Sequence, residues 1–329
     1  MKQFWKDMGI AFTMGMIVPS VLLAAVVSLS ANKSDIPPMT EPVSLTIPVS
    51  ESETVMPQLQ IPVLDQTDGI VQLPLNDYLT SVVLAEMPVS FEEEAIKAQS
   101  VVARTYTMRA VKGAAKHEGA AVCTNSACCQ GYVAVEQFLN KGGKPENVEY
   151  VRNLVASTDG QVLTYDGNLI EATYFSCSGG VTEDAVAVWG TDVPYLQSVP
   201  SPGEENAAYY TDTVTFSATD FASKLGVQLI GEPSQWFSDV TYTAGGGVET
   251  MMIGGQTYAG TQLRKLLSLR STAFTVNVEG DTITIQTRGY GHRVGMSQYG
   301  ADAMAASGST YPEILAYYYQ GTQLTQYSD

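Results

Sequence analysis

The chain has 329 residues, of which 45% are hydrophobic, and its net charge is −17 because 34 acidic residues outweigh 17 basic ones. This length is enough for one large domain or two small ones. The shortage of Lys and Arg argues against a nucleic-acid-binding protein, which needs cations to displace counterions from phosphates. We therefore expect no nucleic-acid partner and a surface of the extracellular type.

Residues 8–32 form an uncharged stretch, MGIAFTMGMIVPSVLLAAVVSLSAN, which is long enough to cross a bilayer as a helix. Lys2 and Lys6 precede it and predict a cytoplasmic tail over residues 1–7, so that the rest of the chain faces outward. A cleavable signal peptide is the rival interpretation, because SLSAN offers small residues near a cleavage point. The length of the apolar stretch favours a single-pass transmembrane anchor.

Residues 33–60 are rich in Pro, Ser, Thr and Glu and show no lasting period, which predicts an extended Pro-rich linker. Residues 61–329 then form one outer domain. Its first element is a β-hairpin over residues 61–75, because two apolar runs flank Asp68-Gly69.

Two helices are predicted next, over residues 76–87 and 90–113, with a short Pro-containing turn between them. Their predicted end signals are Asn76 or Asp77 as the first N-cap, a Ser90–Glu93 capping box for the second helix, and Gly113 as its stop.

The remaining elements alternate irregularly between the two kinds of secondary structure. They are a helix over 147–158, two strands within 161–180, strands and one helix within 211–288, and two helical segments over 295–308 and 311–321. A mixture without regular βαβ alternation is typical of the α+β class. We expect a helical part, which carries Glu86, and a strand-rich part.

Glu86 stands at the end of an apolar helix face formed by Leu79, Val82 and Val83, just before Pro88 bars further helix. One interpretation is a helix-end glutamate that turns to solvent or pairs with an arginine. The other is a general acid, because desolvation and the negative end of the helix dipole both favour a protonated carboxyl.

Lys97 and Arg104 are seven residues apart on the second predicted helix and share a face. They fit either a solvated face with a salt bridge to the Glu92–Glu94 run or a site that binds the hydroxyl or carboxylate groups of a ligand.

One histidine and three cysteines, His117, Cys123, Cys128 and Cys129, lie within thirteen residues. Thiolates and an imidazole suit tetrahedral zinc. A disulfide is the alternative, because the domain lies outside the membrane. Residue types and spacing alone do not decide between them.

The segment YFSCSGGVTE offers Tyr174, whose ring can stack on a ligand, and Ser176 and Ser178, small residues beside a Gly pair where a backbone can approach a ligand. The alternative is a strand-ending turn. The segment GHRVGMSQYGA contains His292, whose spacing fits no metal pattern and which can equally be a structural histidine at a turn.

Four stretches, in this order, resemble the stage II sporulation protein D family, also called the amidase-enhancer family. They are AEMPVSFEEEAIKAQSVVARTY, CCQGY, YFSCSGGVTE and GHRVGMSQYGA. The resemblance implies a lytic transglycosylase that cuts the MurNAc–GlcNAc linkage of peptide-stripped peptidoglycan and leaves 1,6-anhydro-MurNAc ends. Glu86 matches the essential acid, and Lys97 and Arg104 match important basic positions.

The resemblance further places the last segment along the cleft, with Gln298 and Tyr299 as sugar contacts, although Arg293 stands where glycine is more usual. The other sugar contacts that it implies are Lys97, Arg104, Tyr174, Ser176, Ser178 and His292. Some members bind zinc through two Cys and two His at the spacing seen here, so a structural zinc is expected, with Cys128 in place of the second His. The implied partners are glycan strands, a cell-wall amidase and a multi-span membrane protein, stage II sporulation proteins P and M. The implied location is the engulfing membrane of the mother cell. The alternative function is that of a non-catalytic enhancer of an amidase or, more simply, a glycan-binding module.

Overall fold

The computed structural model describes residues 59–327, so the predicted cytoplasmic tail, anchor and most of the linker lie outside the described residues. Within residues 59–327, no helix is both long enough and apolar enough to cross a membrane. Helices and short sheets are mixed without βαβ alternation, which confirms the α+β class.

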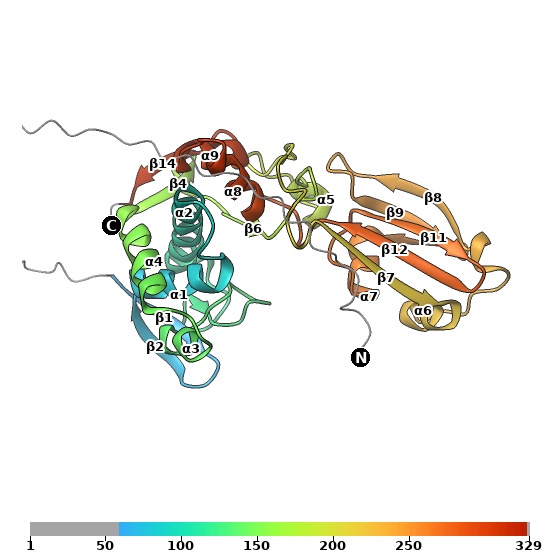
Figure 1. Cartoon of the computed structure of the whole chain (residues 1–329), viewed down its shortest axis with the longest axis horizontal. Helices are drawn as coiled ribbons and strands as arrows, with labels where there is room; N and C mark the ends of the chain where they lie inside the picture. Colours follow the sequence, from blue (N-terminus) through green and yellow to red (C-terminus); the bar gives the residue numbers. More distant parts are fainter. Residues whose placement is uncertain (1–58, 328–329) are drawn as a thin grey trace, which may run out of the picture. The chain divides into compact units, whose positions relative to one another are not determined.

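The elements are numbered in chain order (Figure 1). The first group is β1 Gln60–Asp65, β2 Gly69–Pro74, α1 Leu75–Glu86, α2 Glu93–Arg109, a π-helical turn Ala110–Ala114, β3 Val122–Cys123, α3 Val135–Asn140, α4 Pro145–Ser157, β4 Gln161–Tyr165, β5 Asn168–Leu169, β6 Tyr174–Phe175 and α5 Ala185–Trp189. The second group is β7 Thr211–Ser217, α6 Ala218–Leu225, a 3₁₀ turn Pro233–Gln235, β8 Phe237–Tyr242, β9 Val248–Ile253, β10 Gln256–Ala259, α7 Gly260–Leu266, β11 Phe274–Glu279 and β12 Thr282–Arg288. The chain ends with β13 Met296–Ser297, α8 Gln298–Ala306, α9 Tyr311–Tyr318 and β14 Gln323–Gln326.

The hairpin and both predicted helices before residue 113 are present, but their N-terminal caps differ from the prediction. α1 begins at Leu75 with Pro74 as its N-cap, so neither Asn76 nor Asp77 caps it. α2 begins at Glu93, and the Ser90–Glu93 capping box is absent. At α2 a tertiary contact replaces the predicted local cap, because the backbone N–H of Glu92, the N-cap residue, donates to Asp302 of α8 (2.7 Å).

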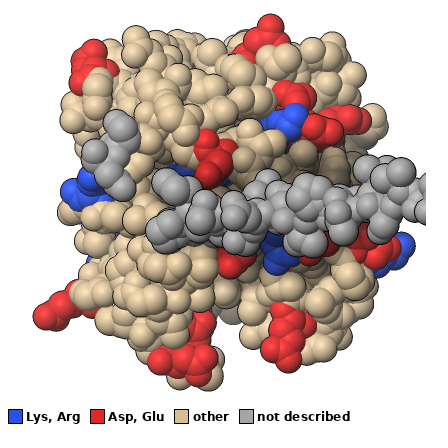
Figure 2. All heavy atoms as spheres, turned by 90° about the vertical axis from the view of Figure 1, so that its left-hand side faces the viewer, with Lys and Arg blue, Asp and Glu red and all other residues tan. Residues whose placement is uncertain are grey.

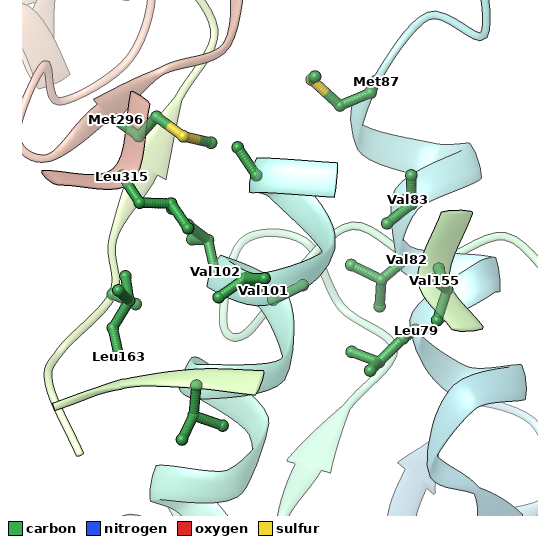
Figure 3. Close-up of a cluster of buried hydrophobic side chains, with 14 of the residues drawn as sticks. Leu79, Val82, Val83, Met87, Val101, Val102, Val155, Leu163, Met296 and Leu315 are labelled. Atoms are coloured by element: carbon green, nitrogen blue, oxygen red, sulfur yellow. The ribbon is translucent and has the colours of Figure 1, made fainter. Parts of the chain in front are cut away.

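α2 is the central helix of the first group, with α1, α4, α8 and α9 packed around it. Figure 3 shows Leu79, Val82 and Val83 of α1 beside Val155 of α4, with Val101 and Val102 of α2 in the same cluster. Full burial of each such side chain contributes about 1.5–3 kcal/mol to folding. This packing fixes the end of α1, where Glu86 lies.

The strand-rich group has a core of its own around Phe221, Phe274, Ile283 and Ile285. Its strands form two antiparallel sheets in the orders β11-β12-β7 and β10-β9-β8. The alternation in β12 places Ile283 and Ile285 on the buried face, as period-2 patterning requires.

Two short parallel pairings bring distant segments together. β13 pairs with β6, so that Met296 lies opposite Tyr174 and the two segments singled out in the sequence become neighbours. β3 pairs with β1 and fixes Cys123 opposite Leu64. Sequence periodicity does not predict pairings of two residues, and it also missed α3, α5 and α6.

Candidate functional site

Glu86 is the last residue of α1, and the backbone N–H of Met87 closes the helix on the carbonyl of Val83 (2.9 Å). The carboxylate is half-buried, whereas Ala85 beside it is exposed. The predicted helix, its apolar face and its end before Pro88 are therefore confirmed.

Two donors meet one oxygen of the Glu86 carboxylate. The backbone N–H of Gly131 donates to Oε1, and the Tyr174 hydroxyl lies 3.1 Å from the same atom. Among the described residues, no donor contacts Oε2. Burial and the neighbouring Glu86 hold the pKa of Tyr174 well above its usual value, so this phenol keeps its proton and can donate it.

Gln130 and Gly131, from the CCQGY stretch, shape this site in a way that sequence reasoning missed. Gln130 is buried, and its amide nitrogen lies 3.1 Å from the Thr107 hydroxyl. Its amide oxygen lies 3.3 Å from the hydroxyl of Tyr174. A Cβ atom at position 131 would lie 2.7 Å from Oε1 of Glu86, so only glycine allows this approach. The sequence feature that could have indicated these two residues is their position as a Gln-Gly pair directly after two candidate metal ligands, Cys128 and Cys129.

The four residues predicted as metal ligands converge. The ligand atoms of His117, Cys123, Cys128 and Cys129 all lie within 4.8 Å of one another, and all four cysteines of the chain are free thiols. Nε2 of His117 lies 3.6 Å from Sγ of Cys128 and 3.5 Å from Sγ of Cys129. A tetrahedral ion with bonds of about 2.3 Å to sulfur and about 2.1 Å to nitrogen requires S···N separations of about 3.6 Å. The group can therefore hold a metal ion.

The metal group and Glu86 are joined by one continuous loop. Cys128 and Cys129 immediately precede Gln130 and Gly131. Nζ of Lys116 donates to the carbonyl of Cys128 (2.8 Å) and ties the loop from its other side. An ion that fixes the two thiolates also fixes the N–H group that contacts Glu86.

Lys97 and Arg104 make contacts within the protein. Lys97 pairs with Glu93 (2.6 Å) and Glu94 (2.9 Å), the salt bridges weighed from the sequence. The Arg104 side chain is buried and donates to the carbonyls of Val155 (2.9 Å) and Thr158 (2.7 Å) at the end of α4. A cation there satisfies carbonyls that have no helical partner. Among the described residues, Glu86 forms no hydrogen bond with either side chain.

The YFSCSGG segment is organised by a buried carboxylate, Glu204. The Ser178 hydroxyl (2.9 Å) and backbone N–H (2.6 Å) and the Cys177 thiol (3.0 Å) all donate to it. Burial and Glu204 raise the pKa of the Cys177 thiol, which argues against a nucleophilic thiolate. The carbonyl of Ser176 accepts from the backbone N–H of Tyr299 (3.0 Å), so these two predicted sugar contacts are neighbours.

His292 lies between two aromatic rings, Phe175 at 5.7 Å and Trp189 at 5.5 Å between centroids. Its Nδ1 accepts from the backbone N–H of Val294 (3.1 Å). Burial, together with the nearby Arg264, lowers its pKa to about 4, so the ring is neutral at pH 7.

The last two predicted sugar contacts lie at the start of α8. Gln298 is buried, and its amide nitrogen has no partner among the described residues. The Tyr299 ring packs edge-on against Phe91 at 4.9 Å.

Comparison of the sequence with known proteins identifies its family. The sequence profile described as stage II sporulation protein matches residues 64–165. Stage II sporulation protein D of Bacillus subtilis is 37% identical over 339 residues, which cover 99% of this chain and 96% of that protein. The protein of the same name from Bacillus amyloliquefaciens is 39% identical over 82% of this chain and 79% of its own length. An amidase enhancer of Bacillus subtilis is 30% identical over 76% of this chain, but only 40% of that protein is covered. The chain belongs to the stage II sporulation protein D family.

Proposed function

We propose that the protein is a membrane-anchored lytic transglycosylase that cleaves MurNAc–GlcNAc bonds in peptide-stripped peptidoglycan during endospore engulfment. The observation that carries this proposal is the arrangement at Glu86. One carboxylate oxygen is held by Gly131 and Tyr174, and the other meets no donor among the described residues. Oε2 is therefore the atom that exchanges a proton with substrate.

The reaction needs only this one carboxyl group. Oε2–H protonates the glycosidic oxygen, and the bond from that oxygen to C1 of MurNAc breaks. The C6 hydroxyl of the same MurNAc attacks C1 and returns its proton to Oε2, which forms the 1,6-anhydro ring and restores the acid. Hydrolases usually need a second carboxylate to activate water or attack C1. Here the nucleophile belongs to the sugar, so the mechanism requires no second carboxylate.

Gly131 and Tyr174 act on the ionised form of Glu86, which exists between the two proton transfers. Charge-assisted hydrogen bonds from an N–H and an O–H stabilise a carboxylate more strongly than neutral pairs. Both donors are held by the fold, since Gly131 follows the metal group and Tyr174 lies in β6.

We infer that the ion is zinc and that its role is structural. Three thiolates and one imidazole are typical of structural zinc, and four protein ligands leave no open position for water or substrate. When bound, zinc would hold the loop that presents Gly131 to Glu86.

The alternative function is a non-catalytic enhancer, which the similarity to an amidase enhancer supports. Mass spectrometry of peptide-stripped glycan after incubation with the purified protein separates the two functions. Anhydro-MurNAc ends are expected from the enzyme. Unchanged glycan, together with faster cleavage of intact peptidoglycan by an added amidase, would establish the enhancer instead.

The proposed location is the engulfing membrane of the mother cell, with residues 8–32 as the anchor and a cell-wall amidase and a multi-span protein as partners. Protease added outside correctly oriented vesicles should digest the outer domain. A mature chain that begins near Ala31 would show that the apolar stretch is a cleaved signal peptide.

A further inference from the structure

Three large aromatic side chains are exposed in the segments that flank the strand-rich group β7–β12. Trp189 at the end of α5 is 44% exposed, Tyr209 before β7 is 40% exposed and Tyr290 after β12 is 41% exposed. The Tyr209 and Tyr290 rings lie edge to face at 5.3 Å, and Trp189 packs on His292 at 5.5 Å. Exposed aromatic rings that gather from separate segments are typical of a binding surface.

Two arginines lie among these rings. Arg270 lies over Tyr209 (5.2 Å) and Tyr290 (5.6 Å) and pairs with Asp212 at 3.1 Å. Arg264 is half-buried and donates Nε–H to the carbonyl of Arg270 (3.2 Å), but it forms no ion pair with any described residue. Burial lowers the pKa of Arg264, because the guanidinium is partly removed from water and no carboxylate of the described residues pairs with it.

A chain of contacts connects this group to Glu86. His292, which packs on Trp189, also packs edge-on against Phe175, the residue after Tyr174 in β6. Tyr174 in turn holds Oε1 of Glu86. A ligand that lies across Trp189 is therefore one side chain, His292, away from strand β6, which carries Tyr174.

We propose that Trp189, Tyr209, Tyr290 and Arg264 form a glycan subsite, in which the rings stack on sugar C–H faces and Arg264 binds a sugar carboxylate. This inference rests on the proposed function, because removal of the stem peptide exposes one lactyl carboxylate on each MurNAc. A guanidinium matches a carboxylate in two parallel hydrogen bonds. Lys97 and Arg104, the cations singled out in the sequence, bind groups of the protein itself.

Trp, Tyr and Arg also dominate protein–protein interfaces, so a protein partner is the competing occupant. The contacts from Trp189 through His292 to Phe175 of β6 favour the glycan, because a subsite must lie in register with the bond that Glu86 cleaves. The unpaired Arg264 favours an anionic ligand on a chain whose net charge is −17.

Binding is measured with the full chain carrying Glu86→Gln, so that no turnover occurs. The probes are a peptide-stripped GlcNAc–MurNAc strand, the same strand with its carboxyl groups reduced to alcohols, and a GlcNAc oligomer of equal length. Arg264→Gln should weaken binding of the first probe about tenfold and change the other two less than twofold, as loss of a charge-assisted pair predicts. Trp189→Ala should weaken all three.

Matched controls are Arg152→Gln, which removes the same charge from an exposed pair with Glu149, and Tyr242→Ala, which removes another exposed ring. Neither should change glycan binding. Equal loss for all three probes in Arg264→Gln, or no loss at all, overturns the carboxylate assignment. Unchanged glycan binding with loss of amidase stimulation would assign the surface to a protein. A failure of the proposed function itself is detected by a separate assay. In that case the wild-type protein would produce no anhydro-MurNAc ends, whichever of the three probes it binds.

Discussion

At the scale of single residues, the site depends on how closely Gly131 approaches Glu86. Its N–H contacts Oε1, and there is no room for a side chain between the two. The contact joins positions 45 residues apart, so no local pattern in the sequence can predict it.

Gly131→Ala should therefore lower turnover sharply while the protein stays folded. The added Cβ would lie 2.7 Å from Oε1 and push the carboxylate aside. A displacement of about 1 Å can reduce the rate about 100-fold. Turnover and melting temperature are measured together, with Gly143→Ala as the contrast, because its Cβ meets Phe138 and should lower stability alone. Normal turnover in Gly131→Ala would show that this contact is not needed.

Arg293, which departs from the usual glycine, has the left-handed φ of 66° that glycine adopts without strain. Its side chain is buried and donates to the carbonyls of Ser178 (2.7 Å), Val181 (2.7 Å) and Gly245 (2.7 Å). It also pairs with Glu183 at 3.1 Å. The backbone thus keeps the conformation of a glycine, and the side chain adds a buried connection.

Arg293→Gly should relieve the backbone strain yet destabilise the protein by about 3–5 kcal/mol, because Glu183 would be left buried without its cation. Asp166→Gly is the matched control, since Asp166 is exposed with a φ of 48°. That change should be neutral or slightly stabilising. Equal effects of the two substitutions in urea unfolding would refute the importance of the buried pair.

His292 predicts a pH dependence of stability. Its pKa is about 4 in the folded protein against 6.5 for a free imidazole. Between these values the unfolded chain binds a proton that the folded chain does not, so the free energy of unfolding falls as the pH is lowered from 6.5 to 4. The slope contributed is at most about 1.4 kcal/mol per pH unit. His292→Gln should flatten the profile in this window, and parallel profiles would count against a neutral, buried ring.

At the scale of elements, the loop from His117 to Gly131 does two tasks. It gathers the metal ligands, and it delivers the N–H group that holds Glu86. Cys129 and Gly131 are two positions apart, so a disturbance at the metal reaches the carboxylate through the backbone.

Chelation or Cys129→Ser should lower melting temperature and turnover together, because structural zinc contributes folding free energy. The loop is small relative to the domain, so the fold should weaken without being lost. Cys177→Ser is the control, since this buried thiol lies outside the metal group and should retain zinc. Elemental analysis of protein purified without added metal checks occupancy. A disulfide among Cys123, Cys128 and Cys129, with no zinc, would contradict the assignment.

The helices were predictable from the sequence where apolar periodicity is long, as in α1 and α2. Their N-terminal caps were not, because α1 begins after Pro74 without a side-chain cap, and at α2 Asp302 of α8 takes the place of a local side chain. Glu86, Tyr174 and the four metal ligands could be singled out by residue type and motif. Gln130, Glu204 and Arg264 could not, because their importance arises from partners that only the fold brings near.

At the scale of the whole molecule, the acidic composition is visible on the surface. On the face drawn in Figure 2, outside the area under the grey atoms, Asp and Glu are scattered and Lys and Arg form no continuous stripe. A ligand that carries carboxylates must therefore be recognised by local cations rather than by the overall field. Arg264 is such a local cation in the proposed glycan subsite.

The central claim is that Glu86 alone supplies the acid and the base. The direct measurement is the rate at which anhydro-MurNAc ends appear from peptide-stripped glycan, followed by mass spectrometry. Compared are the wild-type chain, Glu86→Gln and Glu149→Gln, an exposed glutamate on α4. We predict anhydro ends from the wild type and Glu149→Gln, and a loss of about 100-fold or more in Glu86→Gln with glycan binding retained. Near-normal turnover by Glu86→Gln, or reducing ends from the wild type, would contradict the claim.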